Sequence, residues 1–277
     1  MRIAGQAISI IAALALCLVA QLTLLGVLTH NSDQERAYTD FRVQLANATA
    51  PVRGLDGDRR LLADGTPMAI LAIPKLGLRE VVGEGATPET LKSGPGHRRD
   101  TVLPGQAGTS VLLGRRAAYG GPFGAISTLS AGDEITLTTG QGAHTYRVSG
   151  VRRAGAPQPK ELAKGEGRLT LVTADGPEFL PEDILRVDAK LTSQAVPSNG
   201  APPSMAVRDA EQPMATDSGA LVGLVGWGLV LCAGVAGVVY LRQRAGRWHA
   251  WVVGVPLLGA LGLTVADQAA SLLPNLL

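Results

Sequence analysis

Residues 134–139 read Glu-Ile-Thr-Leu-Thr-Thr, and residues 168–173 read Arg-Leu-Thr-Leu-Val-Thr. Apolar and polar side chains alternate through most of both stretches, which is the period-two pattern of a strand with one buried face. Five further short, β-like runs are separated by glycine and proline, over residues 68–73, 80–83, 110–114, 145–151 and 184–191. Within residues 68–191, helical periodicity is almost absent apart from short turns near residues 88–92 and 160–163. Evenly spaced short strands predict an all-β domain over residues 68–192, and we expect a closed barrel.

Three apolar stretches outside this domain are long enough to cross a bilayer, which takes about 20 residues. They cover residues 7–29, 219–241 and 251–265, and the sequence leaves open whether the third ends near residue 266 or continues to residue 277. The first follows Arg2 and has no clear small-residue cleavage site, so we expect a retained signal-anchor. The chain therefore reads as a multi-pass membrane protein whose expected partners include the lipid bilayer.

Composition and charge support this division. The chain has 277 residues, of which 46% are hydrophobic and only 17% charged, with a formal net charge of +2. Arg2 and the basic stretch 242–249 place the N-terminus and that loop in the cytoplasm by the positive-inside rule. Residues 30–218 then lie outside the cell, and their 16 Arg and 5 Lys face 22 acidic residues. The excess positive charge thus lies in the predicted cytoplasmic segments and reflects membrane topology, so we expect no nucleic-acid partner.

The remaining segments are predicted from composition. We divide the chain into a cytoplasmic N-terminus and signal-anchor (1–30), a juxtamembrane helix and linker (31–67), the barrel (68–192), a Pro-rich tether without a core (193–218), a second span (219–241), a basic cytoplasmic loop (242–250) and a third span with the C-terminus (251–277). Tyr38, Phe41 and Leu45 give the juxtamembrane helix one apolar stripe.

An ordered set of short motifs makes the barrel prediction more specific. The motifs are Ile73-Pro-Lys-Leu-Gly-Leu78, Val82-Gly-Glu-Gly85, Leu91-Lys-Ser-Gly-Pro-Gly-His97, Pro104-Gly-Gln-Ala-Gly108, Leu112-Leu-Gly114, Tyr119-Gly-Gly-Pro-Phe123, Leu129-Ser-Ala-Gly-Asp133 and Leu169-Thr-Leu-Val-Thr173. Together they cover nearly all of residues 68–191, and the chain closely resembles a sortase, most like the actinobacterial class E type. The resemblance implies an eight-stranded β-barrel anchored in the membrane and facing the cell wall, with cysteine transpeptidase activity on sorting signals.

The same resemblance implies three catalytic positions, of which one is kept. The family's His follows Leu-x-Gly, where this chain has Arg115, and its Cys follows Thr-Leu-x-Thr, where this chain has Ala174. The family's Arg, on the next strand, matches Arg186. Ala174 offers no nucleophile, and a guanidinium, which stays protonated at neutral pH, is no general base.

We find no substitute for the missing groups in the sequence. Thr173 should face away from position 174, because neighbours on a strand point to opposite faces. Ser110 and Ser127 have no recognisable base nearby in sequence. We expect His97 to make a structural hydrogen bond in a turn and His144 to be solvated. Cys17 and Cys232 both fall in predicted spans, and we expect no metal site and no cofactor.

The leading hypothesis is a non-catalytic, sortase-like protein that binds, scaffolds or regulates a partner. Two alternatives remain open: an active transpeptidase or hydrolase with a non-standard nucleophile, and a structural subunit of a membrane complex. Arg115 and Arg186, with Asp175 as the nearest counter-charge, predict either an Arg–Asp surface pair or an anion-binding cleft. The partners considered are a sorting-signal-like peptide, a cell-wall polymer and a membrane protein.

Overall fold

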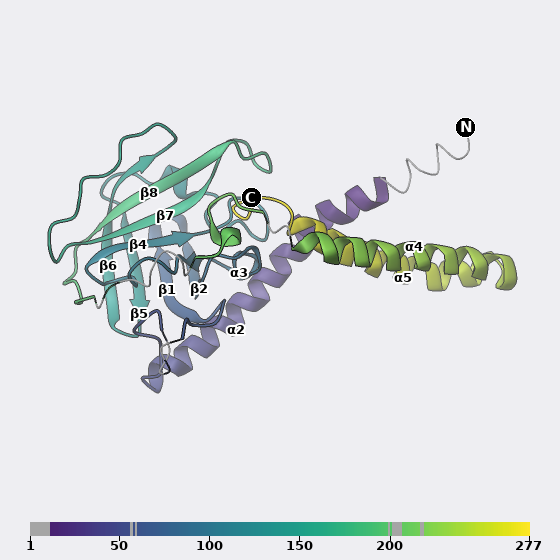
Figure 1. The fold of residues 1–277 in the computed structure, drawn as a ribbon, viewed down its shortest axis with the longest axis horizontal. Coiled ribbons are helices and arrows are strands. Elements are labelled where there is room, and N and C mark those ends of the chain that lie inside the picture. The colour runs from purple at the N-terminus through teal and green to yellow at the C-terminus, as the bar shows by residue number, and fades with distance from the viewer. Residues whose placement is uncertain (1–11, 56–57, 59, 199, 201–206, 217–218) are drawn as a thin grey trace. The chain divides into compact units, whose positions relative to one another are not determined.

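The computed structural model describes residues 12–277 except 56–57, 59, 199, 201–206 and 217–218 (Figure 1). The chain forms two compact units, one of Met1–Gly26 with Thr216–Leu273 and one of Val27–Ala215 with Pro274–Leu277. The last four residues of the sequence therefore belong to the same unit as the β-strands. The predicted cytoplasmic Arg2 lies outside the described residues.

Eight strands close into a barrel, in the order β1-β2-β3-β4-β7-β8-β6-β5 (Figure 1). Their bounds are β1 Pro67–Ile73, β2 Leu78–Glu84, β3 Gly96–His97, β4 Gly108–Leu113, β5 Glu134–Thr139, β6 Gly142–Arg152, β7 Gly167–Asp175 and β8 Asp183–Leu191. This confirms the predicted all-β, eight-stranded barrel, and seven of the eight strands fall on the short β-like runs predicted from the sequence. The predicted helical turn near residues 88–92 is α3, Pro88–Ser93, but residues 160–163 have no helix.

The strand that the sequence does not reveal is β3. It has only two residues, pairs parallel to β2 and antiparallel to β4, and includes His97, which was predicted in a turn. Two residues are too few for any alternation to be visible. The parallel pair of β4 and β7 is longer and places Val111 opposite Thr170.

The barrel interior is filled by alternate residues of the strands. Leu71, Leu112, Leu137, Leu171 and Val187 belong to one continuous apolar cluster and are fully buried. Because side chains alternate along a strand, the residues between them face outward. The outward face of β4, β7 and β8 carries the site described below.

Helix α2, Gly26–Ala46, packs on the outside of β1 and β2. Phe41 is fully buried against Ile70 and Val81, with Tyr38 and Leu45 partly buried beside it, so the predicted apolar stripe is confirmed. The amide of Gln34 fixes the helix further, because its Oε1 accepts from the Val81 N–H at 2.6 Å and its Nε2 donates to the Val81 carbonyl at 3.1 Å.

The prediction that residues 193–218 form a tether without a core is wrong for residues 207–215. The 3-10 turn η5, Asp209–Glu211, contains a fully buried carboxylate at Glu211, and Met214 packs against buried apolar residues. Val196 forms a parallel bridge with Gln106. Proline-rich composition predicted extended chain, but it gave no sign of the buried ion pairs that hold this segment to the barrel.

Three helices of the described chain are long and apolar enough to cross a membrane. They are Ala12–Ala46, which includes the π-helical turn η1 (Gln21–Leu25), Ala220–Arg244 within α4 (Ala220–Ala245), and Arg247–Ala270, which is α5. Gly246, at φ 89°, is the only residue between α4 and α5. The prediction of a loop over residues 242–250 is therefore wrong, because the basic residues of this stretch lie at the end of α4 and the start of α5. Asp267 accepts a hydrogen bond from Gln21 Nε2 at 3.1 Å, and α5 ends at Ala270.

Candidate functional site

The residues singled out from the sequence lie around strand β7. Leu171 faces the barrel interior, so Val172 and Ala174 lie on the outer face. Thr173 faces the interior side, where its Oγ1 donates to the Gly114 carbonyl at 2.8 Å and its side chain is buried. The prediction that Thr173 points away from position 174 is confirmed.

Ala174 is fully buried although it lies on the outer face of the sheet. Its methyl group belongs to a second apolar cluster, whose buried members are Ala86, Leu91, Leu113, Val172, Ala174 and Leu276. Leu276 comes from the end of the sequence, about a hundred residues from β7. The position that the resemblance assigns to the nucleophile is thus an apolar contact under a covering segment.

Arg115 is the largest fully buried side chain of the described chain. Its Nε donates to the Leu91 carbonyl at 3.1 Å and its Nη2 to the Pro88 carbonyl at 2.9 Å. The guanidinium carbon lies 4.9 Å from the centre of the Tyr119 ring, a cation–π contact. Arg115 is therefore positioned by helix α3 and an aromatic ring, and its permanent charge still excludes it as a general base.

The two histidines of the barrel have structural environments. His97 is buried, with Nδ1 2.9 Å from Glu84 Oε2 and Nε2 3.0 Å from the Val102 carbonyl, which confirms its structural hydrogen bonding. The expectation that His144 is solvated is wrong: its side chain is buried, and burial lowers its pKa. His144 lies opposite the interior residue Leu137, and residues opposite each other on paired strands share a face.

Ser110 is a buried interior residue, since it shares the face of Leu112 on β4. A hydroxyl enclosed in the barrel core cannot reach a peptide on the outer face. Ser127 lies in the 3-10 turn η3, Ile126–Thr128, away from these strands in sequence. Within the described residues, no group of three or more His, Cys, Asp and Glu side chains is arranged to hold a metal ion.

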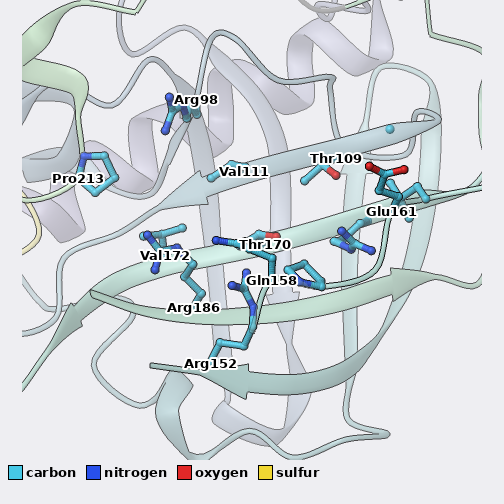
Figure 2. Close-up of a pocket in the computed structure, with 14 residues that line it drawn as sticks. Arg98, Thr109, Val111, Arg152, Gln158, Glu161, Thr170, Val172, Arg186 and Pro213 are labelled. Carbon is cyan, nitrogen blue, oxygen red and sulfur yellow. The ribbon is translucent and has the colours of Figure 1, made fainter. Parts of the chain in front are cut away.

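An open cavity of about 550 Å³ lies on the outer face of β4, β7 and β8 (Figure 2). Four arginines line it, and Glu161 is the one acidic residue in its lining. The lining arginines are Arg98, Arg152, Arg168 and Arg186. Arg98 is paired with Asp100 and Arg152 with Asp188. Arg168 and Arg186 against the Glu161 carboxylate still leave the cavity a positive character, which suits an anionic ligand.

Arg152 and Arg186 are directly opposite each other on β6 and β8, and Figure 2 shows both side chains over β7 and β8. Like charges at opposite positions of an antiparallel pair repel each other. Arg152 is neutralised, because its Nη2 donates to Asp188 Oδ1 at 3.1 Å and Thr170 Oγ1 donates to the same oxygen at 2.8 Å. Arg186 forms no hydrogen bond or ion pair with any described residue, so its charge faces the cavity uncompensated.

Asp175 does not serve as the predicted counter-charge of Arg115 or Arg186. Its carboxylate lies 3.6 Å from Arg116 Nη1 and 3.1 Å from Arg153 Nε. Of the predicted cleft residues, the structure therefore places Arg186 in the cavity, Arg115 in the core and Asp175 in a surface pair with other arginines.

The sequence missed three cavity arginines, Arg98, Arg152 and Arg168, and the covering residue Leu276. No local signal marks them, because they come together only through the β4–β7–β8–β6 strand order. That order cannot be read from spacing along the chain.

Comparison with known proteins agrees with the fold. Residues 71–187 match the sequence model of the sortase domain. Sortase D of Bacillus subtilis (strain 168) is 32% identical over 84 residues, which are 30% of this chain and 41% of that protein. The chain thus matches less than half the length of that relative.

Solved sortase structures are also similar. A Clostridium perfringens Sortase D5 transpeptidase aligns at a TM-score of 0.48 and 23% identity, covering 58% of this chain and 99% of that one. Sortase E from Streptomyces avermitilis aligns at 0.41 and 32% identity, covering 48% and 91%. Sortase E1 from Streptomyces coelicolor, solved with a tripeptide in the active site, aligns at 0.42 and 30% identity, covering 53% and 96%.

The eight-stranded closed barrel and the matched domain define an enzyme fold whose known members are typically transpeptidases. The chain belongs to the sortase family.

Proposed function

We propose that this protein is a membrane-anchored, cell-wall-facing sortase relative without transpeptidase activity, which acts by binding a partner and so scaffolds or regulates it. One observation carries the proposal: the side chain at position 174 is a buried methyl group, packed in one apolar cluster with Leu276. An acyl-enzyme route needs a nucleophile that can reach the scissile carbonyl. Thr173 and Ser110, the hydroxyls closest to this role in the sequence, face the barrel interior.

The partner that fits the remaining site is an anion. Arg186 presents an unpaired guanidinium to the cavity, and Arg168 in the same lining adds a second positive charge. A guanidinium fork binds carboxylate or phosphate through two parallel hydrogen bonds. A peptide carboxylate and the phosphate of a wall polymer both supply this chemistry.

Anion binding is tested with the full chain in detergent, titrated with sorting-signal peptides and with anionic wall fragments. We expect Arg186→Ala to weaken binding at least tenfold, and we expect binding to fall as salt is raised. Arg147→Ala is the matched control, because Arg147 is an exposed arginine on β6 that does not line the cavity. Equal affinities for wild type and Arg186→Ala would reject the anion site.

The proposed location follows from the three apolar helices and the charge distribution. The barrel would lie outside the cell, and the N-terminus and the basic α4–α5 connection would lie in the cytoplasm. The three apolar helices support a multi-pass membrane protein. Within the sortase family, we propose that the chain is of the class E, actinobacterial type.

A further inference from the structure

Pro274–Leu277 packs as part of the barrel unit. Asn275 and Leu276 have no exposed surface, and Leu277 is only 4% exposed. A four-residue segment that follows a membrane helix and has no regular structure of its own would ordinarily be solvated. The burial of its last three residues calls for a site that receives them.

The site is the apolar part of the groove over β7. Leu276 packs in one cluster with Leu91 of α3, Leu113 of β4 and Ala174 of β7. Val172 belongs to this cluster and also lines the arginine cavity. The covered apolar part and the open cationic part therefore adjoin along the same strand.

Backbone hydrogen bonds hold the segment as they would hold a peptide ligand. The Arg116 N–H donates to the Leu276 carbonyl at 2.9 Å, and the Ala118 N–H donates to the Leu277 carbonyl at 3.3 Å. The Asn275 N–H donates to the Ala215 carbonyl at 2.9 Å. Main-chain bonds of this kind fix a segment in place without regard to its side chains.

The Asn275 side chain adds a residue-specific contact. Its Nδ2 lies within donating distance of three carbonyls, Gln212 at 2.9 Å, Ala210 at 3.2 Å and Ala86 at 3.5 Å. A buried amide that reaches three backbone acceptors selects asparagine, because apolar side chains would leave those acceptors unpaired.

We propose that Pro274–Leu277 is a built-in peptide ligand that closes the groove over Ala174. A separate peptide of the same chemistry, an asparagine followed by two leucines, enters only when this segment leaves. A tethered ligand competes at a high effective concentration, so it keeps weaker peptides out of the groove. Occupancy of the groove by this segment does not depend on whether the barrel is catalytic.

The test is the accessibility of position 174. The full chain carries Ala174→Cys in a Cys17→Ser, Cys232→Ser background, and a polar maleimide reports how fast the introduced thiol is labelled. We expect slow labelling with the segment intact, and labelling at least ten times faster with Leu276→Ser or with residues 274–277 deleted. Leu180→Ser is the matched control, because Leu180 is 71% exposed in a loop and should leave the rate unchanged.

A peptide added in trans separates an opened groove from an unfolded barrel. Leu-Leu-Pro-Asn-Leu-Leu should restore protection to the chain lacking residues 274–277, and the same peptide with serine in place of the residue equivalent to Leu276 should not. Asn275→Ala, a second variant that adds no polar group to the core, should also speed labelling. Fast labelling of the intact chain would overturn the proposal. So would unchanged labelling after the deletion, or a deleted chain that the peptide fails to protect.

Discussion

Gly105 shows how closely single residues are fitted at one end of the barrel. Its N–H donates to Tyr146 Oη at 2.6 Å, and its Cα faces the His144 ring. A Cβ at this position would lie 2.2 Å from His144 Nε2, and the backbone φ is +92°. Burial raises the pKa of Tyr146 to about 12, so its hydroxyl stays protonated at neutral pH.

We therefore predict that Gly105→Ala lowers the free energy of unfolding by about 2–4 kcal/mol, through overpacking and a strained φ. Gly132→Ala isolates the second contribution, because Gly132 has φ +98° with no atom within 4 Å of an added Cβ. It should cost about 1–2 kcal/mol. Denaturant unfolding followed by circular dichroism measures both, and equal losses would show that His144 does not crowd Gly105.

His144 predicts an acid-sensitive contribution to stability. Burial lowers the pKa of this imidazole in the folded state, so the unfolded chain binds the proton first as the pH falls. The stability that neutral His144 permits is therefore present above about pH 6.5, the ordinary imidazole value, and is lost as the pH falls through that value toward the folded pKa.

The measurement compares the free energy of unfolding of wild type and His144→Phe at several pH values between about 8 and 5. We expect the wild type to lose more stability than the variant as the pH falls. If the free energy of unfolding falls equally with pH in wild type and His144→Phe, His144 makes no contribution to the pH dependence of stability.

For single residues, the sequence predicted the properties that depend only on neighbouring positions along one strand. The outward Ala174 and the inward Thr173 follow from alternation, and the absence of a thiol from the barrel follows from the positions of Cys17 and Cys232. The position of Arg152 opposite Arg186 and the burial of His144 depend on which strands lie side by side. They required the structure.

Among the elements, the segment after β8 is held by charge. Glu211 is fully buried, and its carboxylate lies 2.8 Å from Arg208 Nε and 3.5 Å from Arg99 Nε. It also accepts from the Ala86 N–H at 3.3 Å. Nearby, burial raises the pKa of Asp64, but hydrogen bonds and charge interactions with Arg208 and Arg99 outweigh it, so the net pKa of that carboxyl is lowered.

Glu211→Gln should destabilise the barrel by about 2–3 kcal/mol, because it removes a buried negative charge that faces two arginines. Glu134→Gln, at an exposed position of β5, should change stability by less than about 0.5 kcal/mol. Thermal unfolding of both variants in detergent measures the difference. An unchanged stability of Glu211→Gln would mean that residues 207–215 are not held by this carboxylate.

Elements with a repeating pattern were predictable, and short or irregular ones were not. Seven strands follow short β-like runs separated by glycine and proline, and the spans show continuous apolarity. Strand β3 has two residues, and the α4–α5 connection is a single glycine between basic helix ends. The covering segments 207–215 and 274–277 are fixed by contacts distant in sequence, which composition cannot reveal.

For the whole molecule, membrane topology makes a direct prediction. In a background without Cys17 and Cys232, Leu180→Cys should react with a membrane-impermeant maleimide in intact cells, because it lies on the barrel. Gln243→Cys, near the α4–α5 connection, should react only after lysis. The reverse pattern would invert the proposed orientation.

Turnover of a sorting-signal peptide with an acceptor amine measures whether this sortase-family barrel performs transpeptidation, and we expect that it does not. The full chain is compared with Arg115→His/Ala174→Cys, with and without residues 274–277, which supplies the missing base and nucleophile. We expect no amide product from wild type and product from the double variant, more when residues 274–277 are removed. Amide product from the wild-type chain that is lost on substitution of Thr173 or Ser110 would show that the barrel is catalytic with a hydroxyl nucleophile.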